Sequence, residues 1–156
     1  MPFYEFSQNN SGGHFTVDEI LCHRLVIEAK DNDHAVQIAE GLGCYWNGVS
    51  EGMDCGCCGD RWYDSENVIE LPSTRPVEVY EFKGSDTKQL WLEKYGSFPI
   101  ETEPTTDTRK TVGVVKLETI EQYCQFVSTA YGWTTPDTRL FLLDGTVKEF
   151  FKYLRV

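Results

Sequence analysis

The sequence predicts an α+β fold with a mainly antiparallel sheet, two or three helices, a long Cys/Gly-rich loop and a C-terminal β-hairpin. Three observations lead to this prediction. Strand-like segments with turn signals lie near both ends of the chain, capped helical repeats lie between them, and residues 44–65 show no period. A chain of 156 residues is long enough for one hydrophobic core, so we expect residues 1–156 to form a single domain.

The N-terminal segment resembles a β-hairpin followed by a longer strand. Residues 3–7 have strand character, residues 9–13 (NNSGG) form a dense turn signal, and residues 14–17 are a second extended piece. Residues 21–29 alternate between apolar and polar side chains, as in a half-buried strand. This alternation places His23 on the apolar face.

Helices are expected where apolar residues repeat at helical spacing between capping residues. Residues 33–42 follow an Asp-Asn-Asp run and end at glycines. Thr119 and Gln122 form a capping box for a helix that we expect to continue through Tyr131, and a shorter helix is expected within 86–96. The sheet would then be covered by helices on one face.

The remaining strands are expected at 68–71, 77–82, 110–117, 139–143 and 146–151. Residues 72–76 have the prolines of a turn, and residues 99–109 resemble a polar linker. Asp144-Gly145 is the dipeptide favoured in tight hairpin turns, so the last two strands should form the C-terminal β-hairpin.

Composition excludes several classes of function. The formal net charge is −11, so nucleic acid would be repelled. No apolar run reaches the roughly 20 residues of a membrane span, and the N-terminus lacks a secretory signal pattern, so we expect a cytoplasmic protein without a membrane partner. Six cysteines in such a chain indicate free thiols or metal ligands rather than disulfides.

The sharpest local motif is DCGCCGDRW, residues 54–62. Cys55 and Cys58 have the spacing of a zinc knuckle, because two intervening residues let a tight turn direct both sulfur atoms at one tetrahedral ion. A second pair at this spacing is absent, so closing a structural zinc site would need further ligands brought in by the fold, from among Cys44, Cys57, His14, Cys22 and His23. The competing interpretation is a Gly-rich loop of reduced thiols in which Cys57 packs inward.

The same loop is rich in aromatic residues and contains an arginine. Aromatic faces stack on purines and a guanidinium pairs with phosphate, so a ligand pocket is one interpretation, and filling of the core is the other. The candidate ligand-binding residues are Arg61, Trp62, Tyr45, Trp46, Asn9 and Asn10. The chain has no nucleophile elbow, P-loop or His-Glu-x-x-His motif, so an enzyme is not the favoured interpretation.

Five segments, FYEFSQNNSGG, CHRLVIEA, YWNGV, DCGCCGDRW and LFLLDGTVKEF, resemble an uncharacterised family of small tailed-phage proteins. The resemblance implies a phage accessory protein in a bacterial cytoplasm, and it transfers no site residue. By analogy, we expect a non-enzymatic binding protein that counters host defence by sequestering a host factor, such as a nucleotide-type immune signal, in a pocket shared across a homo-oligomer. The alternatives are a zinc-stabilised adaptor that binds a host protein, and a cysteine-dependent enzyme.

Overall fold

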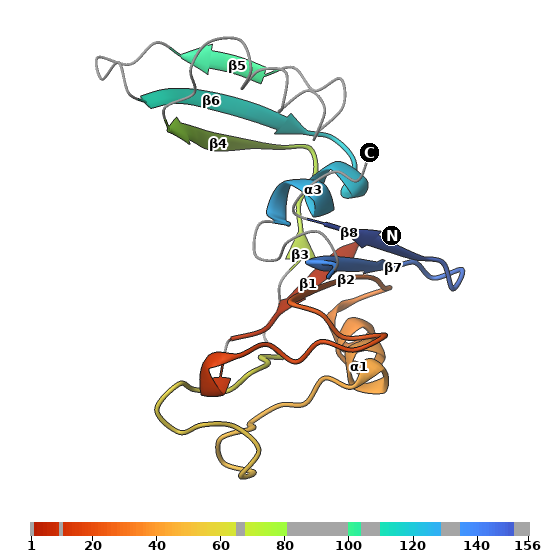
Figure 1. Cartoon of the computed structure of the whole chain (residues 1–156). Coiled ribbons are helices and arrows are strands. Elements are labelled where there is room, and N and C mark those ends of the chain that lie inside the picture. The colour runs from red at the N-terminus through yellow and green to blue at the C-terminus, as the bar shows by residue number, and fades with distance from the viewer. Residues whose placement is uncertain are drawn as a thin grey trace.

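The computed structural model describes residues 2–9, 11–64, 68–80, 100–103, 110–128 and 135–151. In this part of the chain, two sheets, two α-helices and one short 3-10 helix are present. The five-stranded sheet lies between the two helices, the three-stranded sheet lies beyond α3, and the long loop lies at the opposite end of the molecule (Figure 1). The predicted α+β class is confirmed.

The five-stranded sheet has the order β3-β1-β2-β7-β8. Its strands are β1 (Phe3–Ser7), β2 (Arg24–Glu28), β3 (Val68–Ile69), β7 (Thr138–Phe141) and β8 (Val147–Phe150). All neighbours are antiparallel except β2 and β7, which run parallel in the middle of the sheet. The sheet is therefore mainly antiparallel, as predicted.

Both faces of this sheet are buried, one against each helix. On β2, Leu25 and Ile27 pack with helix α1 (Asn32–Leu42), whereas Val26 packs with helix α3 (Ile120–Val127). Because successive strand residues point to opposite faces, α1 and α3 cover opposite sides of the sheet. The expectation of helices on a single face is therefore wrong. The side chains of β2 point alternately into two hydrophobic cores, one on each face of the sheet.

The helix ends are stabilised as the sequence indicates. Asp31 caps α1 by accepting a hydrogen bond from the His34 backbone N–H, and the left-handed Gly43 ends the helix. Thr119 and Gln122 form the predicted capping box of α3. Helix α3 ends at Val127, with Ser128 as its C-cap, and Tyr131 lies outside the described residues.

The three-stranded sheet is antiparallel and has the order β4-β6-β5. Its strands are β4 (Ser73–Tyr80), β5 (Ile100–Glu103) and β6 (Lys110–Leu117). The segment predicted as a turn, 72–76, mostly belongs to β4, and part of the predicted linker forms β5. Proline and polar residues are typical of loops, but an edge strand such as β4 tolerates proline, and both predictions are therefore wrong.

The two predicted hairpins have different outcomes. The C-terminal hairpin of β7 and β8 is confirmed, with Gly145 at a φ of 91° in its turn. The N-terminal hairpin is wrong, because β1 pairs with β2 and β3 while residues 14–17 form no strand. The predicted helix within 86–96 lies outside the described residues. Among the described helices, none combines the length and apolarity needed to span a bilayer.

Candidate functional site

The loop that follows α1, residues 44–64, has no helix or strand but is anchored at its start. The Cys44 backbone N–H donates to the Ala39 carbonyl at 3.0 Å. The Trp46 ring lies 5.9 Å from that of Phe6, and its Nε1–H donates to Glu40 Oε1 at 2.6 Å. The loop therefore leaves the helix in a fixed direction.

A buried carboxylate holds the two halves of the loop together. The Asp54 side chain is fully buried and accepts hydrogen bonds from the Tyr45 hydroxyl at 2.7 Å and from the Arg61 backbone N–H at 2.8 Å. Burial and this hydrogen bond to Asp54 raise the pKa of Tyr45. A Cβ atom at Gly48 would lie only 1.9 Å from Asp54 Oδ2, so glycine is required where the backbone passes the carboxylate.

The Arg61 guanidinium forms contacts inside the protein. Its Nε lies 3.7 Å from Asp54 Oδ1, and its Nη1 donates to the His14 carbonyl at 2.7 Å and to Gln8 Oε1 at 3.2 Å. Only 6% of this side chain is exposed. A phosphate would reach Arg61 only by displacing these contacts, so its predicted ligand role stays a prediction that this geometry does not favour.

The other predicted ligand residues also have structural contacts. Trp62 is 1% exposed and belongs to the core, whereas Tyr45 and Trp46 are partly buried against it. Asn9 donates from its backbone to the Arg61 carbonyl and from its side chain to the Cys58 carbonyl, which ties β1 to the cysteine motif. Asn10 lies outside the described residues.

Three thiols meet at the tip of the loop. The Sγ atoms of Cys55, Cys57 and Cys58 all lie within 4.8 Å of one another, with 2.8 Å between Cys55 and Cys57 and 3.7 Å between Cys57 and Cys58. A tight turn brings them together, in which the backbone N–H groups of Cys58 and Gly59 both donate to the Cys55 carbonyl. Gly59 has a φ of 91°, a left-handed conformation that suits glycine. These thiols are placed to hold a metal ion.

Contacts among the thiols shift the pKa values of Cys55 and Cys57 in opposite directions. The hydrogen bond from Cys57 lowers the pKa of Cys55 to about 7, and the same contact raises the pKa of Cys57 to about 11. Cys57 and Cys58 are exposed, so the prediction that Cys57 packs inward is wrong. Cys55 therefore ionises near neutral pH, whereas Cys57 keeps its proton there.

The other predicted metal ligands do not join this cluster. Among the described residues, Cys44 and His23 are absent from every group of three or more side chains close enough to share an ion. Cys44 is buried in the core, which raises its pKa to about 12, and the His23 ring lies 4.4 Å from that of Phe15. Cys124 is also fully buried, on α3.

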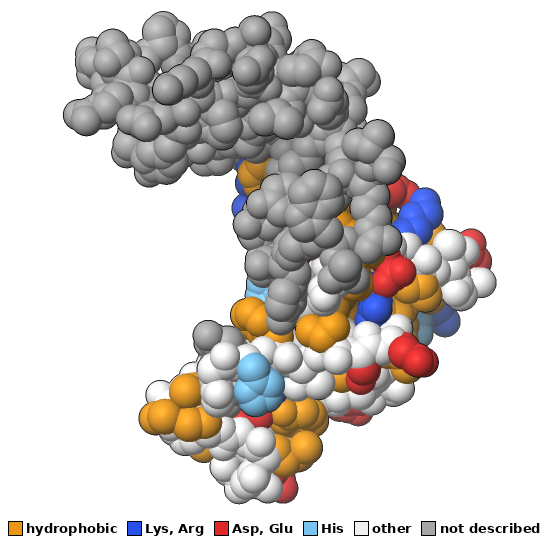
Figure 2. Space-filling view, in the orientation of Figure 1, with side chains coloured by type: hydrophobic (Ala, Val, Ile, Leu, Met, Phe, Trp, Pro, Cys, Tyr) orange, Lys and Arg blue, Asp and Glu red, His pale blue; other side chains and the backbone are white. Residues whose placement is uncertain are grey.

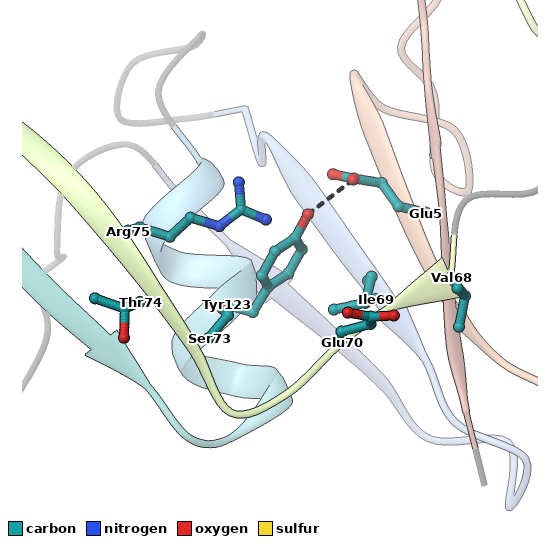
Figure 3. Close-up of a pocket in the computed structure, with 8 residues that line it drawn as sticks. All are labelled: Glu5, Val68, Ile69, Glu70, Ser73, Thr74, Arg75 and Tyr123. Atoms are coloured by element: carbon teal, nitrogen blue, oxygen red, sulfur yellow. Dashed lines mark hydrogen bonds between the residues drawn. The ribbon is translucent and has the colours of Figure 1, made fainter.

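A second candidate site was missed by the sequence analysis. A cleft of about 590 Å³ lies where β1, β3, β4 and α3 meet (Figure 3). Its lining residues are Glu5, Val68, Ile69, Glu70, Ser73, Thr74, Arg75 and Tyr123. The sequence carried no signal for it, because Tyr123 fits the apolar stripe of its helix and the other residues come from three separate strands and from the connection that follows β3.

Residues 1–98 match the family described as a domain of unknown function (DUF7296). No match was found among the curated proteins or among the solved structures. The family match covers more than half of the 156 residues, so the chain belongs to this family. The matched segment contains the cysteine loop and most of the cleft, whereas α3, β7 and β8 follow it.

Proposed function

We propose that this member of the family is a non-enzymatic binding protein whose cysteine loop holds a zinc ion and docks on a host protein. The observation that carries the proposal is the meeting of three thiols on an exposed turn. Sulfur ligands select soft or borderline ions, and zinc is the ion most often bound by clustered cysteines in tight turns. The host context, a phage protein in the bacterial cytoplasm, is part of this proposal.

The spacing of the sulfur atoms supports a tetrahedral ion. With Zn–S bonds of about 2.3 Å, two sulfur ligands of a tetrahedral zinc lie about 3.8 Å apart. The Cys57–Cys58 separation of 3.7 Å already has this value. The Cys55–Cys57 separation of 2.8 Å would need to widen by about 1 Å, which the exposed Cys57 side chain permits by turning outward.

Three thiolates leave one position of a tetrahedral ion open. In the described part of the chain, no histidine, further cysteine or carboxylate joins the three thiols as a fourth ligand. Cys57 and Cys58 are exposed, so this position would face solvent and accept water or a donor atom from another protein. The same loop exposes 62% of Met53 and 50% of Tyr63, and hydrophobic side chains gather at this end of the molecule (Figure 2). The ion would thus sit beside an apolar contact surface.

The geometry favours this adaptor over the two other functions considered. Sequestration of a nucleotide-type signal in the loop would require Arg61 and Trp62 to leave buried positions. A cysteine-dependent enzyme would require a base beside the nucleophile, and no histidine belongs to the thiol cluster in the regions described. The acidic net charge of −11 suits a host partner with a basic surface.

The metal is tested by elemental analysis and by cobalt substitution. We expect one zinc per chain in purified protein and, with Co²⁺, the absorption of a tetrahedral thiolate site. Cys58→Ser should abolish both signals, and the matched variant Cys44→Ala should retain both, since Cys44 is remote from the cluster. Protein that is free of metal and binds no Co²⁺ under reducing conditions would refute the proposal.

The pH profile and the open position provide two further readouts. Metal displaces thiol protons, so the apparent affinity should increase with pH, first as Cys55 ionises near its pKa of about 7. Added imidazole should change the Co²⁺ spectrum by entering the open position. An unchanged spectrum would mean that the coordination is closed and that the ion has no part in docking.

A further inference from the structure

The cleft between the two sheets has an asymmetric charge distribution. The negative charge of Glu5 is compensated within the protein, because Glu5 forms an ion pair with Arg24 and accepts a hydrogen bond from the Tyr123 hydroxyl at 2.8 Å. Burial and this carboxylate both raise the pKa of Tyr123, so the hydroxyl stays protonated and continues to donate. The charges left to face a ligand are those of Arg75 and Glu70.

Arg75 is held in place by an aromatic ring. Its guanidinium carbon lies 5.7 Å from the centre of the Tyr123 ring, a cation–π arrangement. Among the residues that the structure describes, no carboxylate forms an ion pair with it. Because no described carboxylate is paired with it, the planar guanidinium of Arg75 is available to an oxyanion.

A second donor lies next to Arg75. Ser73 is two residues away on β4, so both side chains are on the same face of the strand. The Ser73 Oγ atom is buried and has no hydrogen-bond partner. Buried hydroxyls normally have a partner, so an oxygen atom of a bound molecule would satisfy it. A guanidinium fork and a hydroxyl together suit a phosphate, whose several oxygens accept more than one donor.

The far side of the cleft has the opposite character. Figure 3 shows Glu70 and Arg75 on opposite sides of Tyr123. Glu70 is exposed and would accept hydrogen bonds from hydroxyl or amine groups, while Val68 and Ile69 offer apolar surface beside it. The volume of about 590 Å³ lies in the range of small-molecule sites.

We infer that this cleft binds a small organic phosphate, with the phosphate on Arg75 and Ser73 and a hydroxyl- or amine-bearing body toward Glu70. The site is separate from the proposed zinc loop and does not depend on it. Adenosine 5′-monophosphate carries both features and serves as the probe, with ribose 5-phosphate, adenosine and inorganic phosphate as partial probes.

Isothermal titration calorimetry on the full chain tests the site. We expect adenosine 5′-monophosphate to bind, adenosine not to bind, and ribose 5-phosphate to bind more tightly than inorganic phosphate. Arg75→Gln should weaken binding by about 10- to 150-fold, the range for a charge-assisted hydrogen bond. Ser73→Ala should weaken it by a smaller factor.

Lys116→Gln is the matched control, because it removes the same charge from an exposed side chain outside the cleft. It should bind the probe as the wild type does, and circular dichroism should show the same fold for all variants. Three results would overturn the inference: no binding of adenosine 5′-monophosphate at millimolar concentration, equal weakening by Arg75→Gln and Lys116→Gln, or equal affinity for adenosine and its monophosphate.

Discussion

Replacement of Asp54 tests whether its carboxylate holds the cysteine loop in place. Asp54→Ala removes the acceptor of the Tyr45 and Arg61 hydrogen bonds and leaves the guanidinium of Arg61, 6% exposed, without its carboxylate. Removing one partner of a buried ion pair costs about 3–5 kcal/mol. We therefore expect the free energy of unfolding to fall by about that amount. Asp54→Asn keeps the shape and one acceptor oxygen, so its cost should be smaller, about 2 kcal/mol.

Urea unfolding followed by circular dichroism and tryptophan fluorescence measures this cost. A chelator in all samples removes any contribution from metal. With a slope of about 2 kcal/mol/M, Asp54→Ala should lower the midpoint by about 2 M. Tyr45→Phe provides a double-mutant cycle, because its effect should largely disappear once Asp54 is alanine. Additive effects of the two changes, or a loss below about 1 kcal/mol for Asp54→Ala, would refute the account of a shared network.

Two further predictions concern single positions. Gly48→Ala should destabilise the protein and release Tyr45 from Asp54. The added Cβ would lie 1.9 Å from Asp54 Oδ2 and 2.8 Å from the Tyr45 ring. An unchanged melting temperature would contradict this prediction. Burial, and then the neighbouring Arg24 charge, lower the pKa of His23, so the folded state binds fewer protons than the unfolded state. The free energy of unfolding should therefore decrease as the pH falls below about 6.5, and a His23→Gln variant that keeps the same slope would disprove this assignment.

The helices were predictable because their signals are local. The Asp31 cap, the left-handed Gly43 and the capping box at Thr119 involve residues a few positions apart, and each has the predicted geometry. The C-terminal hairpin is local in the same sense, because its turn is specified by Asp144-Gly145. The pairing partners of β1 are not local: β2 is separated from it by a long connection and β3 by 60 residues. The turn signal at residues 9–13 therefore predicted the wrong partner strand for β1.

The candidate site was predicted in part for the same reason. The spacing of Cys55 and Cys58 predicts that both thiols lie in one tight turn, as they do, whereas the exposed position of Cys57 beside them was not predicted. The exclusion of Cys44 and His23 depends on packing, because Cys44 lies in the core and His23 lies against Phe15. The sequence likewise gave no indication that Arg61 would face inward.

By itself, the sequence determined the fold class, the capped helices, the terminal hairpin and the thiol turn, because short-range geometry and hydrophobic periodicity specify these features. The tertiary structure alone decided that the sheet is covered on both faces, that Arg61 is enclosed while Arg75 is open, and that β1, β3, β4 and α3 form a cleft. The physical reason is that burial and charge pairing depend on which distant segments meet, and a one-dimensional pattern does not encode that meeting.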